Sequence, residues 1–141
     1  MSTNRLQSQT TRRVLIADDD PTLLQLVTNI LKREGYTPVV ACDGREAFRI
    51  LQSDCDFVAA IFDADMPHLL GSDLVNHMRT ERRLLRIPVM IMSASEGLLK
   101  NNALSSGVAV FLPKPFTSDQ LRVMLRMLEG SRLAAPKLSA A

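Results

Sequence analysis

The chain has 141 residues, of which 46% are hydrophobic and 23% are charged, and its formal net charge is +2. This length predicts one domain with a real core, and the composition is typical of a globular protein rather than a disordered one. The small net charge and the scattered arginines give no indication of direct nucleic-acid binding. Because no apolar run approaches the about 20 residues of a membrane span, we expect no membrane partner either.

The two cysteines, Cys42 and Cys55, lack the spacing of a metal or redox site. We expect both to be reduced thiols, in the core or at the surface, without a disulfide between them. The first eleven residues are polar and have no apolar signal-peptide centre. The sequence therefore favours a cytoplasmic protein, with residues 1–11 as a flexible N-terminal tail.

Five short apolar runs predict β-strands, and the third of them is the most distinctive. It covers residues 57–62, leads directly into Asp63 and cannot continue past Pro67. An unbroken apolar run is typical of a strand that is buried on both faces, as in a parallel sheet. The other predicted strands are residues 12–17, 37–41, 88–92 and 108–112.

Apolar residues at helical spacing predict a helix after each strand. The first helix begins at Asp20-Pro21, an aspartate cap followed by proline, and ends at Gly35. Gly130 is expected to end the last helix, so that residues 12–129 form the domain and residues 130–141 a flexible tail or linker. The remaining helices are marked by apolar side chains within residues 47–51, 74–78, 96–105 (a weak pattern) and 121–128.

Strands that alternate with helices indicate a parallel sheet with right-handed crossovers and helices on both faces. We therefore predict an α/β, doubly wound (βα)5 fold with three layers. In such a sheet the carboxyl ends of the strands lie at one edge, where ligands bind. Four strands end in chemically distinctive residues, which we expect to converge there: Asp18 and Asp19, Asp63, Ser93, and Lys114.

These side chains suit phosphoryl transfer to a carboxylate, with Asp63 as the acceptor. Clustered carboxylates repel one another unless a cation lies among them. A hard divalent ion with oxygen ligands fits, most simply Mg²⁺ or another such as Mn²⁺. Lys114 would add positive charge for the phosphate, and the Ser93 hydroxyl could donate to one of its oxygens. The sequence has no glycine-rich phosphate loop, so we do not expect a bound nucleotide as the donor.

Four motifs follow one another along the chain: Asp18-Asp19, Asp63-Ala64-Asp65-Met66-Pro67, Ser93-Ala94 and Phe111-Leu112-Pro113-Lys114-Pro115-Phe116. Together, in this order, they resemble the receiver domain of two-component response regulators, over about residues 12–129. The resemblance implies a flavodoxin-like fold with strand order 2-1-3-4-5. It implies that a histidine kinase or histidine phosphotransfer protein passes a phosphoryl group to Asp63. It also implies a signalling switch rather than an enzyme, with at most slow self-dephosphorylation.

By the same resemblance, Asp19 and Asp63 would give carboxylates to the metal, with Asp18 assisting. The backbone carbonyl of Asp65 would complete the protein ligands. The side chain of Asp65 is a departure, because the family is variable at this position. We expect it either to strengthen metal binding or to disturb the water that hydrolyses the phosphoaspartate, and so to change the lifetime of the phosphorylated state.

The resemblance also marks Ser93 and Phe111 as a switch pair, although Phe111 could equally be a core residue. The Lys114–Pro115 peptide bond is expected to be cis, as in the family. No effector domain is recognisable after residue 130, so we expect either a fragment of a longer regulator or a stand-alone receiver with output through a downstream protein or a homodimer. The helix at 96–105, the strand at 108–112 and the last helix would form that surface. The apolar residues that would form a docking patch on this surface are Leu98, Leu99, Val123 and Met127. The alternative is that they are ordinary exposed side chains.

Two other interpretations remain. Asp63-Ala64-Asp65 after an apolar strand also resembles the opening motif of haloacid-dehalogenase-type phosphatases. That family needs its Ser/Thr, Lys and acidic pair after the motif, whereas the acidic cluster here precedes it. A degenerate receiver used only as a scaffold is the third interpretation, and the intact acceptor, metal and lysine positions argue against it.

Overall fold

The computed structural model describes residues 12–94 and 107–140, the last nine of these by their backbone alone. Five parallel strands form one sheet in the order β2-β1-β3-β4-β5. This order confirms the predicted flavodoxin-like α/β fold. The strands are β1 (Arg13–Ala17), β2 (Thr37–Ala41), β3 (Ala59–Asp63), β4 (Val89–Ser93) and β5 (Val110–Pro113).

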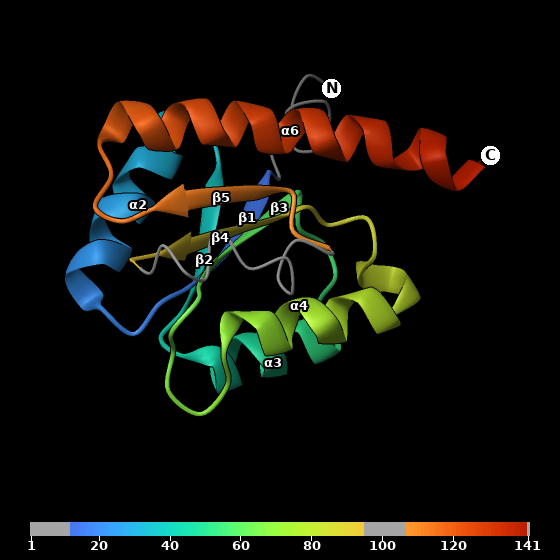
Figure 1. The fold of residues 1–141 in the computed structure, drawn as a ribbon, viewed down its shortest axis with the longest axis horizontal. Helices are drawn as coiled ribbons and strands as arrows, with labels where there is room; N and C mark the ends of the chain where they lie inside the picture. The colour runs from blue at the N-terminus through green and yellow to red at the C-terminus, as the bar shows by residue number, and fades with distance from the viewer. Residues whose placement is uncertain (1–11, 95–106, 141) are drawn as a thin grey trace, which may run out of the picture.

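Helices cover both faces of the sheet and make three layers (Figure 1). One face carries α2 (Pro21–Arg33) and α6 (Ser118–Ala140), and the other carries α3 (Gly44–Ser53) and α4 (Gly71–Thr80). A short 3-10 turn, η1 (Arg82–Leu84), follows α4. The buried side chains accordingly form two clusters, one on each face. The helix predicted at residues 96–105 and the tail at residues 1–11 lie outside the described residues.

Local capping sets where the helices begin. The carboxylate of Asp20 accepts hydrogen bonds from the backbone N–H groups of Thr22 and Leu23, as predicted for the start of α2. Asp43 caps α3 in the same way through the N–H of Glu46. At the other end of α2, Gly35 adopts φ +89°, a left-handed conformation that ends the helix without strain.

Strand β3 is buried along its whole length, which confirms the interpretation of its apolar run. It begins two residues later than predicted, because the N–H of Phe57 bonds to the carbonyl of Cys55 in a turn. The strand also ends one residue later than predicted, so that Asp63 is its last residue. Strand β5 likewise begins at Val110, two residues later than predicted.

The prediction that Gly130 ends the last helix is wrong, because α6 continues to Ala140. Gly130 lacks the positive φ of a helix-ending glycine. A Cβ placed there would meet nothing within 4 Å, so no packing forces the chain to turn. A glycine inside a helix costs only about 1 kcal/mol relative to alanine, which the flanking residues can offset.

Two arginines form ion pairs at the end of the sheet where the parallel strands begin. Arg13 forms a bidentate ion pair with Asp54, with N–O distances of 3.0 and 2.8 Å. Arg12 pairs with Glu129 of α6 and stacks over the ring of Tyr36 at 4.3 Å. The two cysteines are free and exposed. Among the described helices, none has the length and apolar character needed to cross a membrane.

Candidate functional site

The four predicted strand ends meet at one edge of the sheet. Asp18 follows β1, Asp63 ends β3, Ser93 ends β4, and Lys114 follows β5. The parallel hydrogen-bond ladder continues past the strands and holds these ends in register. The N–H of Ala64 donates to the carbonyl of Met92, and the N–H of Lys114 donates to the carbonyl of Ser93, each at 2.8 Å. The Lys114–Pro115 bond is cis, as predicted.

The ammonium group of Lys114 lies between two buried carboxylates. Its Nζ is 3.1 Å from Oδ1 of Asp63 and 3.3 Å from Oδ2 of Asp18. The residues Asp18 and Asp63 are only 1% and 5% exposed. Such charge-assisted contacts are strong where water is excluded. Three of the predicted site residues therefore meet at one point.

Three carboxylates form a cluster that suits a metal ion. One oxygen from each of Asp18, Asp19 and Asp63 can be chosen so that all lie within 4.8 Å of one another. Asp19 is exposed, so the cluster is open to solvent on that side. An all-oxygen, anionic donor set is what Mg²⁺ and similar hard cations prefer. These residues therefore fit the predicted divalent ion.

The surroundings of Asp18 and Lys114 shift their proton affinities. Burial raises the pKa of Asp18, and the negative charge of Asp63 raises it further. Two contacts lower this pKa without cancelling the rise. They are the N–H of Asp20, which donates to the Asp18 carboxylate at 2.9 Å, and the positive charge of Lys114. Burial lowers the pKa of Lys114, but the two carboxylates outweigh burial and raise it overall. The ammonium form of Lys114 is therefore favoured, and the site retains an excess of negative charge that attracts cations.

Ser93 and Phe111 lie on neighbouring strands and face the same side of the sheet. Phe111 is the register partner of Ile91 on β4, and side chains two residues apart along a strand share a face. Ser93 therefore points to the same face as Ile91 and Phe111. Ser93 is fully buried, whereas Phe111 is half-buried and packs against the core below α3 and α4.

The sequence profile described as "Response regulator receiver domain" matches residues 14–126, within the domain predicted at residues 12–129. The chain belongs to the receiver domain family. The chemotaxis protein CheY1 of Helicobacter pylori is 32% identical over 121 residues, which cover 84% of this chain and 98% of that protein. The family match, this relative and the four sequence motifs together identify the chain as a response regulator receiver domain.

Solved structures agree with this assignment. The chemotaxis response regulator CheY4 of Vibrio cholerae superimposes with a TM-score of 0.78 at 28% identity, covering 84% of this chain and 99% of that one. The receiver domain of the Francisella response regulator 1452 gives a TM-score of 0.74 at 30% identity, covering 85% and 98% of the two chains. The receiver fold thus spans nearly the whole length of both relatives.

The sequence analysis missed two glycines that position the receiver site. A Cβ on Gly71, the first residue of α4, would lie 2.7 Å from the carbonyl oxygen of Asp63. A Cβ on Gly44 would lie 2.1 Å from the carbonyl oxygen of Leu69. A side chain at either position would force the neighbouring backbone to shift, so the glycines allow α4 to begin against Asp63 and the loop after β3 to pack against α3. A glycine before a helical pattern could have indicated a close backbone approach, but the same pattern is equally typical of an ordinary turn.

Proposed function

We propose that this receiver domain accepts a phosphoryl group on Asp63 from the phosphohistidine of a histidine kinase or histidine phosphotransfer protein. The observation that carries this proposal is the position of Lys114, whose ammonium group contacts the carboxylate of Asp63 at 3.1 Å within an acidic cluster. A lysine at this distance can balance the negative charge of an incoming phosphoryl group without blocking the second oxygen of Asp63.

In the transfer, a carboxylate oxygen of Asp63 attacks the phosphorus and forms a P–O bond. The P–N bond to the donor imidazole breaks, and its electron pair returns to the ring nitrogen, which binds a proton from solvent. Mg²⁺ or Mn²⁺ would be held by Asp18, Asp19 and Asp63, with the backbone carbonyl of Asp65. The ion would supply charge neutralisation for the phosphoryl oxygens.

We further propose that Ser93 and Phe111 report the phosphorylated state. The hydroxyl of Ser93 would donate to a phosphoryl oxygen, and the ring of Phe111 would move inward into the space that Ser93 vacates. The shared face of these two side chains and the half-buried position of the ring support this role. The change would be read by a downstream protein, or by a second copy of the chain.

The docking surface that we propose for this output lies on β5 and α6; Leu98 and Leu99, which are expected to complete it, lie outside the described residues. On α6, Val123 and Met127 are 54% and 55% exposed, which supports the apolar patch expected from the sequence. The domain would act as a switch that is modified once and slowly hydrolyses its own phosphoaspartate. We place this exchange in the cytoplasm, where reduced thiols such as Cys42 and Cys55 persist.

The decisive experiment is intact mass spectrometry after incubation with acetyl phosphate and Mg²⁺. The wild-type protein is expected to gain one phosphoryl group, and Asp63→Asn none. The matched control is Asp65→Asn, which keeps the acceptor and changes a neighbouring carboxylate. An equal gain on Asp63→Asn would refute the acceptor assignment, and continuous release of phosphate with fast turnover would refute the switch function.

A further inference from the structure

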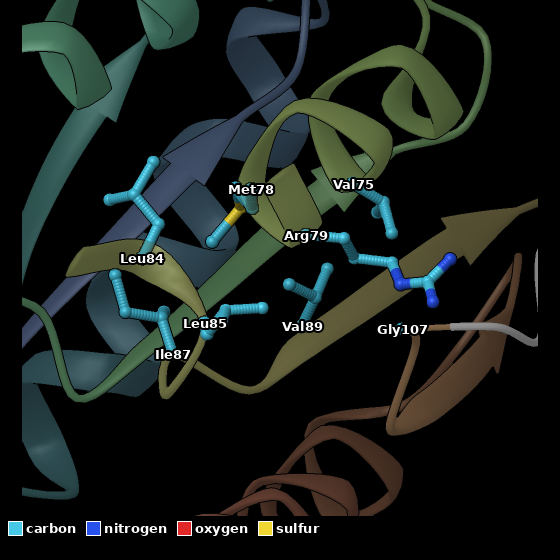
Figure 2. Close-up of a pocket in the computed structure, with 8 residues that line it drawn as sticks. All are labelled: Val75, Met78, Arg79, Leu84, Leu85, Ile87, Val89 and Gly107. Carbon is cyan, nitrogen blue, oxygen red and sulfur yellow. The ribbon is translucent and has the colours of Figure 1, made fainter. Parts of the chain in front are cut away.

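The opposite edge of the sheet from Asp63 carries two adjoining hollows, which we call the Leu85 groove. The first hollow is about 120 Å³ and is lined by apolar side chains of α4, η1 and the start of β4 (Figure 2). The second is about 190 Å³ and lies against the residues that lead into β4 and β5. Leu85, Ile87 and Gly107 line both hollows, so the two lie side by side.

The size and lining of the hollows suit apolar side chains. A cavity of about 150 Å³ accommodates a benzene ring, and the two hollows bracket this volume. The first is lined by Val75, Met78, Leu84 and Val89. Leu85 is 55% exposed between the hollows. The Leu85 groove therefore offers places for two apolar side chains of a ligand, separated by Leu85.

Arginines line the mouth of the groove. Arg79 lines the first hollow and Arg86 the second. In Figure 2 the side chain of Arg79 extends from α4 toward Gly107, and a Cβ on Gly107 would lie only 2.4 Å from Cδ of Arg79. The glycine thus lets the stem of Arg79 lie flat and hold its guanidinium at the mouth.

These guanidinium groups are available to a ligand. Within residues 12–94 and 107–131, no carboxylate forms an ion pair with Arg79, Arg82 or Arg86. Arg83, by contrast, contacts Glu81 at 3.7 Å. Elsewhere at this edge, Arg12 and Arg13 are paired with Glu129 and Asp54. The positive charge at the Leu85 groove is therefore left uncompensated by the described part of the chain.

We propose that the Leu85 groove binds an acidic, amphipathic segment of a partner protein. The segment inserts two apolar side chains, one on each side of Leu85, while its carboxylates pair with Arg79 and Arg86. A second copy of this chain is a poor occupant, because a symmetric contact would bring the same arginines face to face. An anionic membrane is also disfavoured, because concave hollows receive side chains, whereas a membrane surface requires projecting apolar groups.

Short fluorescent peptides test this proposal by anisotropy. The probe pool carries two Leu or Phe residues one helical turn apart among Asp and Glu residues. The matched pool replaces every Asp and Glu by Lys. Acidic peptides are expected to bind, and the basic pool is not. For the tightest acidic peptide, Arg79→Glu plus Arg86→Glu is expected to weaken binding by about tenfold or more, because each reversal replaces attraction by repulsion.

Three further variants make the result specific to the groove. Leu85→Glu is expected to abolish binding, whereas Arg33→Glu, a single charge reversal on the exposed end of α2, is expected to leave it unchanged. Asp63→Asn is also expected to leave binding unchanged, which separates this surface from the phosphoryl site. Thermal melts of each variant establish that it is folded.

Several results would overturn the proposal. One is equal binding of the acidic and basic pools, and another is equal loss of binding in Arg33→Glu and the double variant. Vesicles of phosphatidylglycerol that bind wild type but not the double variant, with no acidic peptide bound, would make the groove a membrane contact. Self-association that Leu85→Glu abolishes, again without peptide binding, would make it an interface between copies.

Discussion

The ammonium group of Lys114 lies 3.1 Å from Oδ1 of Asp63. The same nitrogen is 3.3 Å from Oδ2 of Asp18. One ammonium group therefore contacts two buried carboxylates at the ends of the neighbouring strands β1 and β3. The backbone N–H of Lys114 is also fixed, because it donates to the carbonyl of Ser93. The position of the ammonium group is therefore set from both ends of the residue, and the balance of charge around it can be tested by removing one carboxylate at a time.

Asp18→Asn is expected to raise the melting temperature in EDTA at neutral pH. Burial, followed by the charge of Asp63, raises the pKa of Asp18 above its ordinary value of 3.8. A carboxylate whose folded pKa is raised favours folding below its unfolded pKa and loses that contribution as the pH rises through the folded pKa. At neutral pH its charge therefore opposes folding, and the neutral amide relieves this cost. Thermal melts by circular dichroism measure the difference.

The same variant should respond less to metal. Adding Mg²⁺ is expected to raise the melting temperature of the wild type more than that of Asp18→Asn, since one anionic ligand is lost. Asp20→Asn is the matched control, because asparagine caps a helix about as well as aspartate. A lower melting temperature of Asp18→Asn in EDTA, with an unchanged Mg²⁺ response, would contradict both expectations.

Asp65→Asn is expected to lengthen the lifetime of the phosphorylated protein several-fold. Asp65 follows the acceptor by two residues, and its N–H donates to Oδ1 of Asp63 at 3.4 Å while its side chain is exposed. From there its carboxylate can accept a proton from the attacking water, which the amide cannot do. The decay is followed by intact mass after removal of the phosphodonor. Asp56→Asn, at the other edge of the sheet, should decay like wild type, and an equal rate in Asp65→Asn would refute the role.

Tyr36 is expected to ionise only at high pH in the folded protein. Burial, and then the nearby carboxylate of Glu129, raises the pKa of Tyr36 to about 12. Since Tyr36 is the chain's single tyrosine and there is no tryptophan, tyrosinate absorbance after a rapid pH jump reports it alone. Folding is favoured by this group below its unfolded pKa of about 10, and that contribution is lost as the pH rises through about 12. Glu129→Gln should lower the folded midpoint; an unshifted midpoint would speak against this contact.

Gly44→Ala and Gly130→Ala are expected to change stability in opposite directions. At Gly44 the new Cβ would lie 2.1 Å from the carbonyl oxygen of Leu69, so the loop after β3 must move, at a cost of about 1–3 kcal/mol. At Gly130 the new Cβ meets nothing within 4 Å, and alanine should stabilise α6 by about 0.5–1 kcal/mol. Urea unfolding measures both. Equal effects of the two substitutions would show that the close approach to Leu69 does not constrain the loop.

Much of the fold follows from patterns that the sequence displays locally. The apolar run before Asp63 identifies a doubly buried strand, and Asp20-Pro21 identifies the start of α2, because each signal depends only on neighbouring residues. Once the strands are parallel, the convergence of Asp18, Asp63 and Lys114 follows from topology. The strand order needed the resemblance to receiver domains, since the alternation of strands and helices is compatible with several orders.

The remainder depended on contacts between distant segments. Glycine is a common helix-ending residue, but only the surroundings of Gly130 show that nothing turns the chain there. Gly44 and Gly71 are required by the carbonyl groups of Leu69 and Asp63, which no local pattern reveals. The Leu85 groove likewise arises where α4, η1 and the segments that lead into β4 and β5 meet. Its arginines could be read from the sequence only as a solvated, basic helix end.

The grouping of three carboxylates with one ammonium has a consequence for ion selection. With all four groups charged, two negative charges remain, which one divalent ion neutralises and one sodium or potassium ion cannot. Monovalent cations would therefore have to enter as a pair into a space bounded by oxygens within 4.8 Å of one another, where they would repel each other. Valence, rather than a tightly shaped cage, would thus give the cluster a preference for a divalent ion over sodium or potassium.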